Sequence, residues 1–348
     1  MKIENDIKLD FNDVLLRPKR STLSSRSDVS VERTFQFRHS KRTWHGVPII
    51  SSNMDTISSV DMFKSLSKNK IITCFHKYID IQEVIKACQE GHSSEYFMLS
   101  TGITERDLET LRTNVDLLSA GGIDLAFVCI DVANGYMFKL IEFCKKVRQM
   151  LPNVTLVAGN VVSREITEEL AINGEIDIIK VGIGSGAVCT TRLQTGVGMP
   201  QLSAVMECAD AAHGLDVAII SDGGICHPGD LGKAYGGGAD FVMLGSMLSG
   251  HTESPGEIIE ENGKKYKLFY GMSSDTAMNK YHGGVASYRS SEGKTVKVPY
   301  KGDVQDTINN ILGGVRSTCT YIGANRIKDI NKCATFVRVN RQVNTFYK

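Results

Sequence analysis

Eight short apolar segments constrain the fold of this chain more than any other feature. Each consists largely of residues that favour strands, and an amphipathic stretch separates it from the next. Continuous apolar character, without alternation, is typical of parallel strands buried on both faces. Eight such strands alternating with helices predict an α/β fold of the TIM type, a closed (β/α)8 barrel. The segments are Val47–Ser51, Ile71–Phe75, Tyr96–Leu99, Ala126–Ile130, Thr155–Ala158, Ile178–Val181, Val217–Ile220 and Phe241–Leu244.

The stretches between these segments have the pattern of helices. In Pro200–Gly214 the apolar residues recur at helical spacing, with a proline suited to the first turn and a glycine suited to the C-cap. Ser163 is a candidate N-cap for a helix that reaches Asn173.

An open, doubly wound sheet also alternates strands with helices, and periodicity does not separate it from a barrel. The number of units fits closure, and polar residues or glycines follow nearly every strand. A barrel brings these positions together at one face, where its active site lies. They are Asn53, Asp55, His76, Lys77, Ser100, Asp131, Asn134, Asn160, Gly184, Asp222, Gly245 and Ser246.

We expect one domain over residues 1–348, with an N-terminal extension over residues 1–45. After the eighth strand the repeating unit stops. Residues 282–302 are rich in Gly, Ser, Lys and Tyr, which predicts a long loop at the active site. A disordered insertion is the alternative for that segment. Residues 303–348 form a C-terminal extension in this prediction.

The composition excludes several classes of protein. The 40 Lys and Arg residues nearly balance the 39 Asp and Glu residues, so the chain lacks the basic surface of a nucleic-acid binder. No apolar run is long enough to span a membrane, and residues 1–10 do not resemble a signal peptide. Nine cysteines without metal-ligand spacing predict reduced thiols and a cytoplasmic protein.

The sharpest local signal is a glycine-rich loop that leads from the sixth strand to Cys189. Three glycines between Lys180 and Cys189 let the backbone turn tightly and approach a ligand. A thiol at the active-site face is a candidate nucleophile, provided that a neighbour activates it. Thr191 and Arg192 are neighbours in sequence. The alternative is an inert, buried cysteine, which is the commoner role of this residue.

Two further glycine loops follow the seventh and eighth strands, where barrels frequently bind phosphate through backbone amides. They contain Asp222, Gly223 and Gly224 in one case, and Gly245 and Ser246 in the other. Residues 271–274 form another amide-rich turn. Ordinary glycine turns are the alternative for each, but their shared position at strand ends favours an anion site.

Together these motifs resemble the family of IMP dehydrogenase and GMP reductase. The resemblance is carried by the Cys189 loop, by residues 222–224, 241–245, 270–274 and 298–302, and it extends from Phe11–Pro18 to Thr335–Val339. Within the family the chain is similar to the reductase branch. It has no room for a regulatory CBS insert after the second strand, residues 131–136 and 158–161 resemble the reductase, and residues 288–295 replace the Arg-Tyr pair of the dehydrogenase flap. The alternatives are an IMP dehydrogenase without its insert and a catalytically silent nucleotide-binding barrel.

The resemblance implies a reaction in purine nucleotide salvage, the NADPH-dependent conversion of GMP to IMP and ammonia. Cys189 would attack purine C2 to give a covalent thioimidate, while Thr191 and Glu292 would supply the proton to the departing amine. The resemblance also implies a homotetramer and a potassium site. The implied potassium residues are Gly184, Gly186, Cys189 and Arg192.

The resemblance implies two sets of ligand contacts. For the nucleotide these are Asp222, Gly223, Gly224, Gly245, Ser246, Gly271, Met272, Ser273, Arg289, Ser290, Ser291, Glu292 and Gly293. For NADPH they are Ser25, Arg26, Lys77, Asp131, Val132, Ala133, Ile183, Gly184, Met272, Tyr288, Arg289, Ser317, Thr318, Cys319 and Thr320. Three positions depart from the family pattern: Ser246 replaces a usual glycine, Ser185 a proline and Met199 a tyrosine.

Overall fold

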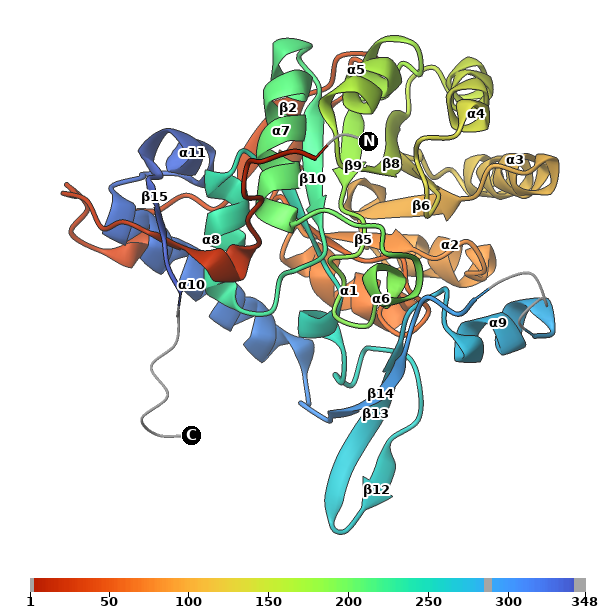
Figure 1. Cartoon of the computed structure of the whole chain (residues 1–348). Helices are drawn as coiled ribbons and strands as arrows, with labels where there is room; N and C mark the ends of the chain where they lie inside the picture. The colour runs from red at the N-terminus through yellow and green to blue at the C-terminus, as the bar shows by residue number, and fades with distance from the viewer. Residues whose placement is uncertain (1–2, 285–289, 341–348) are drawn as a thin grey trace.

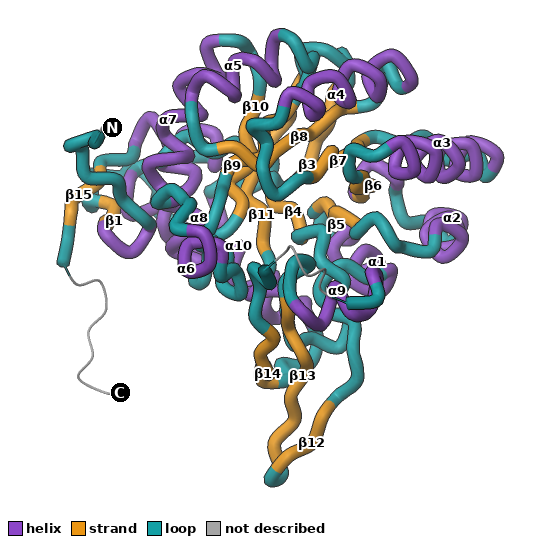
Figure 2. The backbone as a smooth tube through the Cα atoms, turned by 45° about the vertical axis from the view of Figure 1, so that its right-hand side comes forward, coloured by secondary structure: helices purple, strands orange, loops and turns teal. Residues whose placement is uncertain are grey.

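The computed structural model describes residues 3–284 and 290–340, and its centre is a closed barrel of eight parallel strands (Figures 1 and 2). All eight predicted segments form barrel strands, so the fold prediction is confirmed. Val242 pairs with Ile49, which joins the last strand to the first and rules out an open sheet. The strands are β4 (Ile49–Ser51), β5 (Ile72–Phe75), β6 (Phe97–Thr101), β7 (Phe127–Asp131), β8 (Thr155–Val161), β9 (Ile178–Val181), β10 (Ala218–Asp222) and β11 (Phe241–Leu244).

A helix follows each of the first seven barrel strands and covers the outside of the barrel (Figure 1). Ser163 is the N-cap residue of α5, as predicted, but its hydroxyl makes no capping bond and lies 3.0 Å from the Tyr136 hydroxyl instead. Pro200 is the N-cap of α7 and does not lie in its first turn. The helices are α1 (Val60–Lys68), α2 (Ile81–Gln89), α3 (Glu105–Ala120), α4 (Phe138–Met150), α5 (Arg164–Ile172), α7 (Gln201–Gly214) and α8 (Pro228–Gly236).

The eighth helix of the barrel lies in the segment that the sequence assigned to a C-terminal extension. Helix α10 (Val304–Ile322) packs against α8 and α1 and closes the ring of helices. It was not recognised as a barrel helix because residues 245–303 separate it from β11, far more than the usual βα connection.

The insertion before α10 forms a three-stranded arm that projects from the barrel (Figures 1 and 2). It contains β12 (Ile259–Glu261), β13 (Lys264–Tyr270), helix α9 (Asp275–His282) and β14 (Thr295–Pro299). The prediction of one long loop over 282–302 is therefore wrong for residues 295–299. This strand is short and half-exposed, and antiparallel pairing with β13 stabilises it, a partner that local composition does not reveal.

The N-terminal extension closes the bottom of the barrel. Strands β2 (Arg33–Gln36) and β3 (Thr43–Gly46) form a hairpin whose aromatic side chains pack onto the first residues of two barrel strands. The ring of Trp44 lies 5.5 Å from Phe241 and 6.2 Å from Phe127, and all three side chains are buried. Burial of each ring stabilises the fold by about 1.5–3 kcal/mol. The opposite end, where the strands finish, is left for a ligand.

The remaining short elements lie around the barrel ends. Strand β1 (Val14–Leu16) pairs with β15 (Phe336–Arg338), which joins the two ends of the described chain. Within the described residues, no helix combines the length and apolar character needed to cross a membrane. All nine cysteines are free thiols. The other short elements are η1 (Phe11–Asp13), η2 (Arg26–Asp28), η3 (Ser94–Tyr96), α6 (Thr191–Thr195), η4 (Ser246–Leu248), η5 (Ile327–Asp329) and α11 (Ile330–Cys333).

Candidate active site

A cavity of about 280 Å³ lies at the carboxyl ends of the barrel strands. The loops after β4, β7 and β9 and the carboxyl ends of β8, β9 and β10 line it, together with two segments of the insertion. The three predicted catalytic residues and ten of the residues predicted to bind a ligand meet here. The lining residues are Ser52, Asn53, Met54, Asp131, Val132, Ala133, Asn160, Lys180, Gly182, Ile183, Gly184, Gly186, Val188, Cys189, Thr191, Asp222, Gly271, Met272, Ser273 and Glu292.

The loop that carries Cys189 depends on its glycines. Gly182 and Gly184 have φ of +146° and +78°, a backbone conformation that other residues rarely adopt. A Cβ atom on Gly182 would lie only 2.1 Å from the carbonyl oxygen of Asp222. The loop therefore passes close beneath the end of β10, and it delivers Cys189 to the wall of the cavity.

Cys189, Thr191 and Glu292 form a continuous chain of hydrogen bonds. The Cys189 thiol donates to the Thr191 hydroxyl over 3.2 Å, and that hydroxyl donates to Glu292 Oε2 over 2.7 Å. All three side chains line the cavity and are partly buried. A hydroxyl both accepts and donates, so Thr191 can pass a proton between the thiol and the carboxylate.

Backbone hydrogen bonds hold Glu292 at this position. Its amide donates to the Ser273 carbonyl over 3.1 Å, and its carbonyl accepts from the Thr190 amide over 2.9 Å. The next residue, Gly293, pairs with both Cys189 and Ser274 in isolated bridges. Residues 290–294 therefore lie across the cysteine loop, which brings the predicted acid to the predicted nucleophile.

Beneath the thiol, a buried lysine joins two carboxylates. Lys180 Nζ lies 2.7 Å from Asp131 Oδ1 and 2.9 Å from Asp222 Oδ2. Burial opposes the charge on Lys180, but Asp131 and Asp222 outweigh it and hold the lysine pKa well above its usual value. Burial likewise opposes the charge on Asp131, and Lys180 overcomes it and lowers the Asp131 pKa. Amide nitrogens of Asn53 and Asn160 donate to the same two carboxylates over 2.8 Å each.

The two predicted phosphate loops lie at the ends of adjacent strands, since β10 pairs with β11. Gly223 and Gly224 have φ of +96° and +78°. Among the described residues no acceptor is found for the amides of Gly223, Gly224 and Ser246. Ser246 begins the short helix η4 with Gly245 as its N-cap. These free donors suit an anionic group, and the serine amide keeps the role that a glycine would have.

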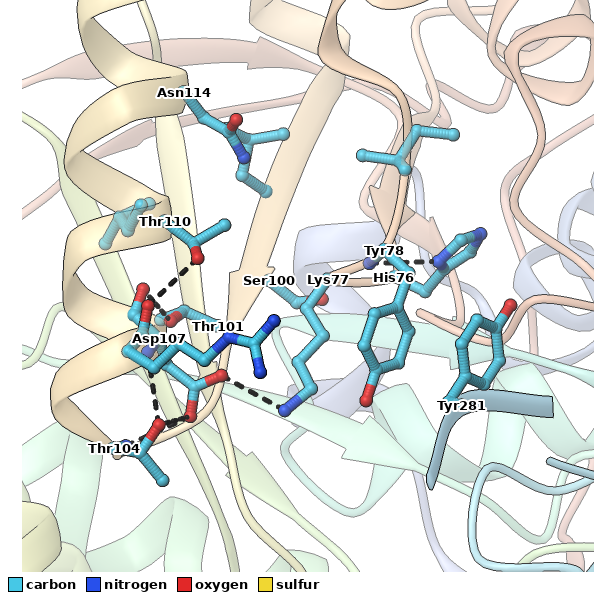
Figure 3. Close-up of a pocket in the computed structure, with 14 residues that line it drawn as sticks. His76, Lys77, Tyr78, Ser100, Thr101, Thr104, Asp107, Thr110, Asn114 and Tyr281 are labelled. Atoms are coloured by element: carbon cyan, nitrogen blue, oxygen red, sulfur yellow. Dashed lines mark hydrogen bonds and ion pairs between the residues drawn. The ribbon is translucent and has the colours of Figure 1, made fainter. Parts of the chain in front are cut away.

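A groove continues from the cavity toward α3. Two further cavities of about 310 Å³ and 420 Å³ share His76, Lys77 and Tyr78 among their walls. Figure 3 shows Lys77 reaching Asp107, with its ammonium 3.1 Å from the carboxylate. The ring of Tyr78 is stacked on that of Tyr281 at 4.0 Å.

Asp55 anchors the insertion to this groove. Its buried carboxylate oxygen Oδ2 accepts hydrogen bonds from the hydroxyls of Tyr270 and Tyr281, at 3.0 Å and 2.8 Å, and from Lys280 at 2.9 Å. Burial raises the pKa of Tyr270 to about 12, with Asp55 adding to the effect. The sequence identified Asp55 only as a polar residue after a strand.

Several predicted cofactor residues lie elsewhere. Ser25 is the N-cap of η2, Arg26 is its first residue, and η2 contacts α10, which carries residues 317–320. The two predicted segments are thus neighbours, but neither lines the cavity or the groove. In both views α10 lies apart from α3, whose residues between Arg106 and Asn114 line the groove (Figures 1 and 2).

The loop predicted to close the site is only partly described. Ser290 is exposed, and the Ser291 hydroxyl donates to the carbonyl oxygens of Gly293 and Ser273 over 3.2 Å and 3.5 Å. Neither serine lines the cavity in the described residues. Tyr288 and Arg289, also predicted to bind ligands, fall outside the described residues.

The predicted potassium residues surround one turn of the Cys189 loop. The Arg192 guanidinium contacts Asp10 Oδ2 at 3.1 Å and the Met199 carbonyl at 2.7 Å, and its aliphatic part packs against Gly184. Among the described residues no group of three or more His, Cys, Asp or Glu residues is placed to hold a metal. Any cation here would rely on backbone carbonyls.

Lys180 and Asn160 received no role from the sequence, although the structure places both beside predicted ligand residues. The sequence contained one signal for the role of Lys180, because this lysine lies inside the apolar segment Ile178–Val181. A charged residue in a strand buried on both faces requires a buried partner. Asp131 and Asp222, at the ends of nearby strands, were the candidates for that partner.

The sequence matches the family model described as "IMP dehydrogenase / GMP reductase domain" over residues 8–344. The chain is 57% identical to GMP reductase 2 of Homo sapiens over 346 residues, covering 99% of this chain and 98% of the relative. It is 55% identical to GMP reductase of Escherichia coli O81 (strain ED1a) over 349 residues, covering 100% and 99%. GMP reductase of Caenorhabditis elegans is 54% identical, with coverage of 99% and 96%.

Proposed function

The chain belongs to the family of IMP dehydrogenase and GMP reductase, and from that premise we propose that it is an NADPH-dependent reductase that converts GMP to IMP and ammonia. The observation that supports this most directly is the chain of hydrogen bonds from Cys189 through Thr191 to Glu292. It combines a nucleophile with a group that holds a proton, and the reaction needs both.

In the proposed mechanism, Glu292 takes up a proton from solvent between turnovers, and the Cys189 thiolate adds to purine C2. Glu292 then donates its proton through Thr191 to the exocyclic nitrogen. The C2–N bond then breaks, ammonia leaves, and a thioimidate joins C2 to Cys189. This covalent route divides one difficult displacement into easier steps.

The second half-reaction is a reduction. NADPH, when bound, would supply the hydride that reduces C2 of the thioimidate and would be released as NADP⁺. The C2–S bond then breaks, which releases IMP and restores the Cys189 thiolate. No acid is needed at this step, because the thiolate itself is the leaving group.

The cavity offers matching groups for the nucleotide. We assign the ribose hydroxyls to Asp222, whose Oδ1 has no hydrogen-bond partner among the described residues. The free amides of Gly223, Gly224 and Ser246 are assigned to the 5′-phosphate. Gly271, Met272 and Ser273, together with residues 289–293, complete the proposed nucleotide contacts, and Met272 and Ser273 also form part of the groove.

The groove fits a dinucleotide in its chemistry and its position. It begins at Asp131, Val132 and Ala133 beside the cavity and continues past the cations Lys77 and Arg106. We assign the nicotinamide end of the cofactor to Asp131, Val132 and Ala133. We assign its phosphates to Lys77 and Arg106, because ammonium and guanidinium groups bind phosphate well. Ile183 and Gly184, which were also predicted to contact the cofactor, line the adjoining cavity.

We also propose a potassium ion at the backbone carbonyls of Gly184, Gly186 and Cys189, with Arg192 beside it. Carbonyl oxygens are the ligands that potassium prefers. The fit is supported by the exposed carbonyl-rich turn and by the pairing of Arg192 with Asp10, which neutralises its charge. The ion would stabilise the loop that carries the nucleophile.

We also propose that the protein forms a homotetramer and is located in the cytoplasm. The segments around Arg26 and Ser317 lie away from the groove of their own chain, so a neighbouring subunit is required if they are to contact the cofactor. Nine free thiols are consistent with a reducing compartment.

Absorbance of the reduced nicotinamide tests the proposal directly. The purified chain, mixed with GMP and NADPH, should consume NADPH and release ammonia. IMP with NAD⁺ and no ammonia should give no sustained turnover, whereas an IMP dehydrogenase would produce NADH. Absence of turnover with both pairs would favour a nucleotide-binding protein without catalysis.

A further inference from the structure

Lys180 occupies an unusual position, inside the barrel between the two ligand sites. We propose that Lys180 is a shared counter-ion that positions Asp222 for the nucleotide and Asp131 for the cofactor, so that both binding events depend on this one ammonium group. The inference rests on the proposed function, because it takes the ligands of the two carboxylates from there.

The geometry places both carboxylates against a single nitrogen atom. Lys180 Nζ bonds Asp131 Oδ1 at 2.7 Å and Asp222 Oδ2 at 2.9 Å, and the lysine side chain is 3% exposed. Lys180 lies on β9 and Asp222 ends the adjacent strand β10. Asp131 ends β7, which β8 separates from β9. The lysine therefore spans the interior of the barrel and joins its cofactor side to its substrate side.

Other contacts fix the two carboxylates but do not neutralise them. Asn53 donates to Asp131 Oδ2 and Asn160 donates to Asp222 Oδ2, and neither amide carries a charge. Asn160 also donates to the Gly182 carbonyl over 2.7 Å, which ties the group to the cysteine loop. Lys180 is the only cation within ion-pair distance of either carboxylate among the described residues.

The ionisable groups near Lys180 are few. Besides the two carboxylates, the thiols of Cys129 and Cys74 face it from β7 and β5, and Lys77 acts on Asp131 from the groove. Burial raises the pKa of the Cys74 thiol well above its usual value, so this group stays neutral. Without Lys180, two partly buried carboxylates would share one site, where nearby like charges do not both ionise readily.

Loss of the ammonium should therefore weaken both sites together. In Lys180→Met, one carboxylate takes up a proton or turns away, and each ligand loses part of a charge-assisted hydrogen bond. We expect the dissociation constants of GMP and NADPH to rise by about ten- to a hundredfold each. A side chain that served only one ligand would affect only that ligand.

Removing one carboxylate should restore the other site. In Lys180→Met/Asp131→Asn the repulsion is gone, and GMP affinity should return to within about threefold of wild type. In Lys180→Met/Asp222→Asn, NADPH affinity should recover in the same way. The buried lysine Lys233 on α8 provides the matched control: it bonds the Phe11 carbonyl at 2.9 Å, lies outside the site, and as Lys233→Met should bind both ligands as wild type does.

GMP binding by calorimetry and NADPH binding by fluorescence measure these constants on the full chain. Wild type that binds neither ligand would contradict the proposed function itself. Given binding by wild type, the inference fails if Lys180→Met loses affinity for one ligand alone or for none, or if GMP affinity is not rescued by Asp131→Asn. If Lys180→Met does not fold, the two double variants provide the test. Each removes the uncompensated charge that we propose as the cause of the defect, so each must fold and bind the ligand of its remaining carboxylate.

Discussion

The hydroxyl of Thr191 donates a 2.7 Å hydrogen bond to Glu292, although 101 residues separate the two in the chain. The contact forms because Gly293 pairs with Cys189, which lays residues 290–294 of the insertion across the loop after β9. The insertion therefore does more than cover the cavity, since it contributes the carboxylate that accepts a hydrogen bond from the partner of Cys189.

Glu292→Gln should separate the two half-reactions. The amide keeps the shape of the side chain but does not act as an acid, and loss of general acid catalysis typically costs 10²–10⁴-fold. GMP turnover should fall by about that factor. IMP with NADP⁺ should still give a burst of NADPH in a single turnover, because that half-reaction involves no ammonia. If the burst disappears in a folded, GMP-binding variant, Glu292 does not act on the ammonia step alone.

Cys189→Ala should abolish turnover while leaving the fold and GMP binding largely intact. The thiol lines the cavity and no other cysteine does. Cys88→Ser, at a half-buried thiol on α2, is the matched control and should retain activity. Steady-state NADPH consumption and GMP calorimetry measure both effects. Retention of a tenth of the wild-type rate in Cys189→Ala would exclude the covalent mechanism.

The barrel was predictable because its strands are buried on both faces. Such segments are continuous in sequence and stand out from amphipathic helices, so that the bounds of β9 and β11 match the predicted segments residue for residue. Strand β14 and the barrel position of α10 escaped prediction for a different reason. The pairing of β14, an exposed strand of five residues, and the packing position of the amphipathic helix α10 both depend on partners distant in sequence.

The site was predictable in part. Strand ends and glycine loops indicated Cys189, Asp131 and Asp222 without reference to any relative, because a barrel has one active face. Glu292 emerged only from the family resemblance, since its partner is 101 residues away. Lys180 received no role because composition and periodicity do not show which carboxylates form ion pairs with a buried lysine.

His213 should make stability depend on pH. Its Nε2 lies 2.8 Å from Asp240, and this hydrogen bond raises the histidine pKa above 6.5, with burial opposing. The stabilisation is thus fully present below about pH 6.5 and is lost as pH rises through the folded-state pKa. The ring is 40% exposed, so solvent screening keeps the effect below about 1 kcal/mol. Urea unfolding should show that lowering the pH from 8.5 to 5.5 favours the folded state more in wild type than in His213→Asn.

Arg148→Met should destabilise the fold strongly without touching the site. The guanidinium bonds Asp177 at 2.7 Å, and the side chains are only 8% and 0% exposed. Removing one partner of a buried pair typically costs 3–5 kcal/mol. Arg148→Met/Asp177→Asn should recover part of that loss, while Lys146→Met, which breaks an exposed pair with Glu105, should shift the urea midpoint far less. Equal midpoints for Arg148→Met and Lys146→Met in urea would contradict this account.

Arg26 should contribute to a preference for NADPH over NADH. A charge-assisted hydrogen bond to the adenosine phosphate is worth about 1.5–3 kcal/mol, so Arg26→Ala should lower the ratio of kcat/KM for the two cofactors about ten- to a hundredfold. Arg112→Ala, at an exposed arginine on α3, should leave the ratio unchanged. Equal use of both cofactors by wild type would refute the prediction.

The position of Arg26 makes a stricter test possible. Within one chain η2 packs against α10, away from the groove, so Arg26 reaches the cofactor only if it acts on a neighbouring subunit. In the proposed homotetramer, a mixture of Cys189→Ala and Arg26→Ala subunits then forms some complete sites, because one subunit supplies the thiol and its neighbour the guanidinium. NADPH turnover at limiting cofactor should exceed the sum of the two separate variants. If mixing gives only that sum, Arg26 does not act across a subunit boundary, and the preference for NADPH has to come from groups in the groove itself, such as Arg106.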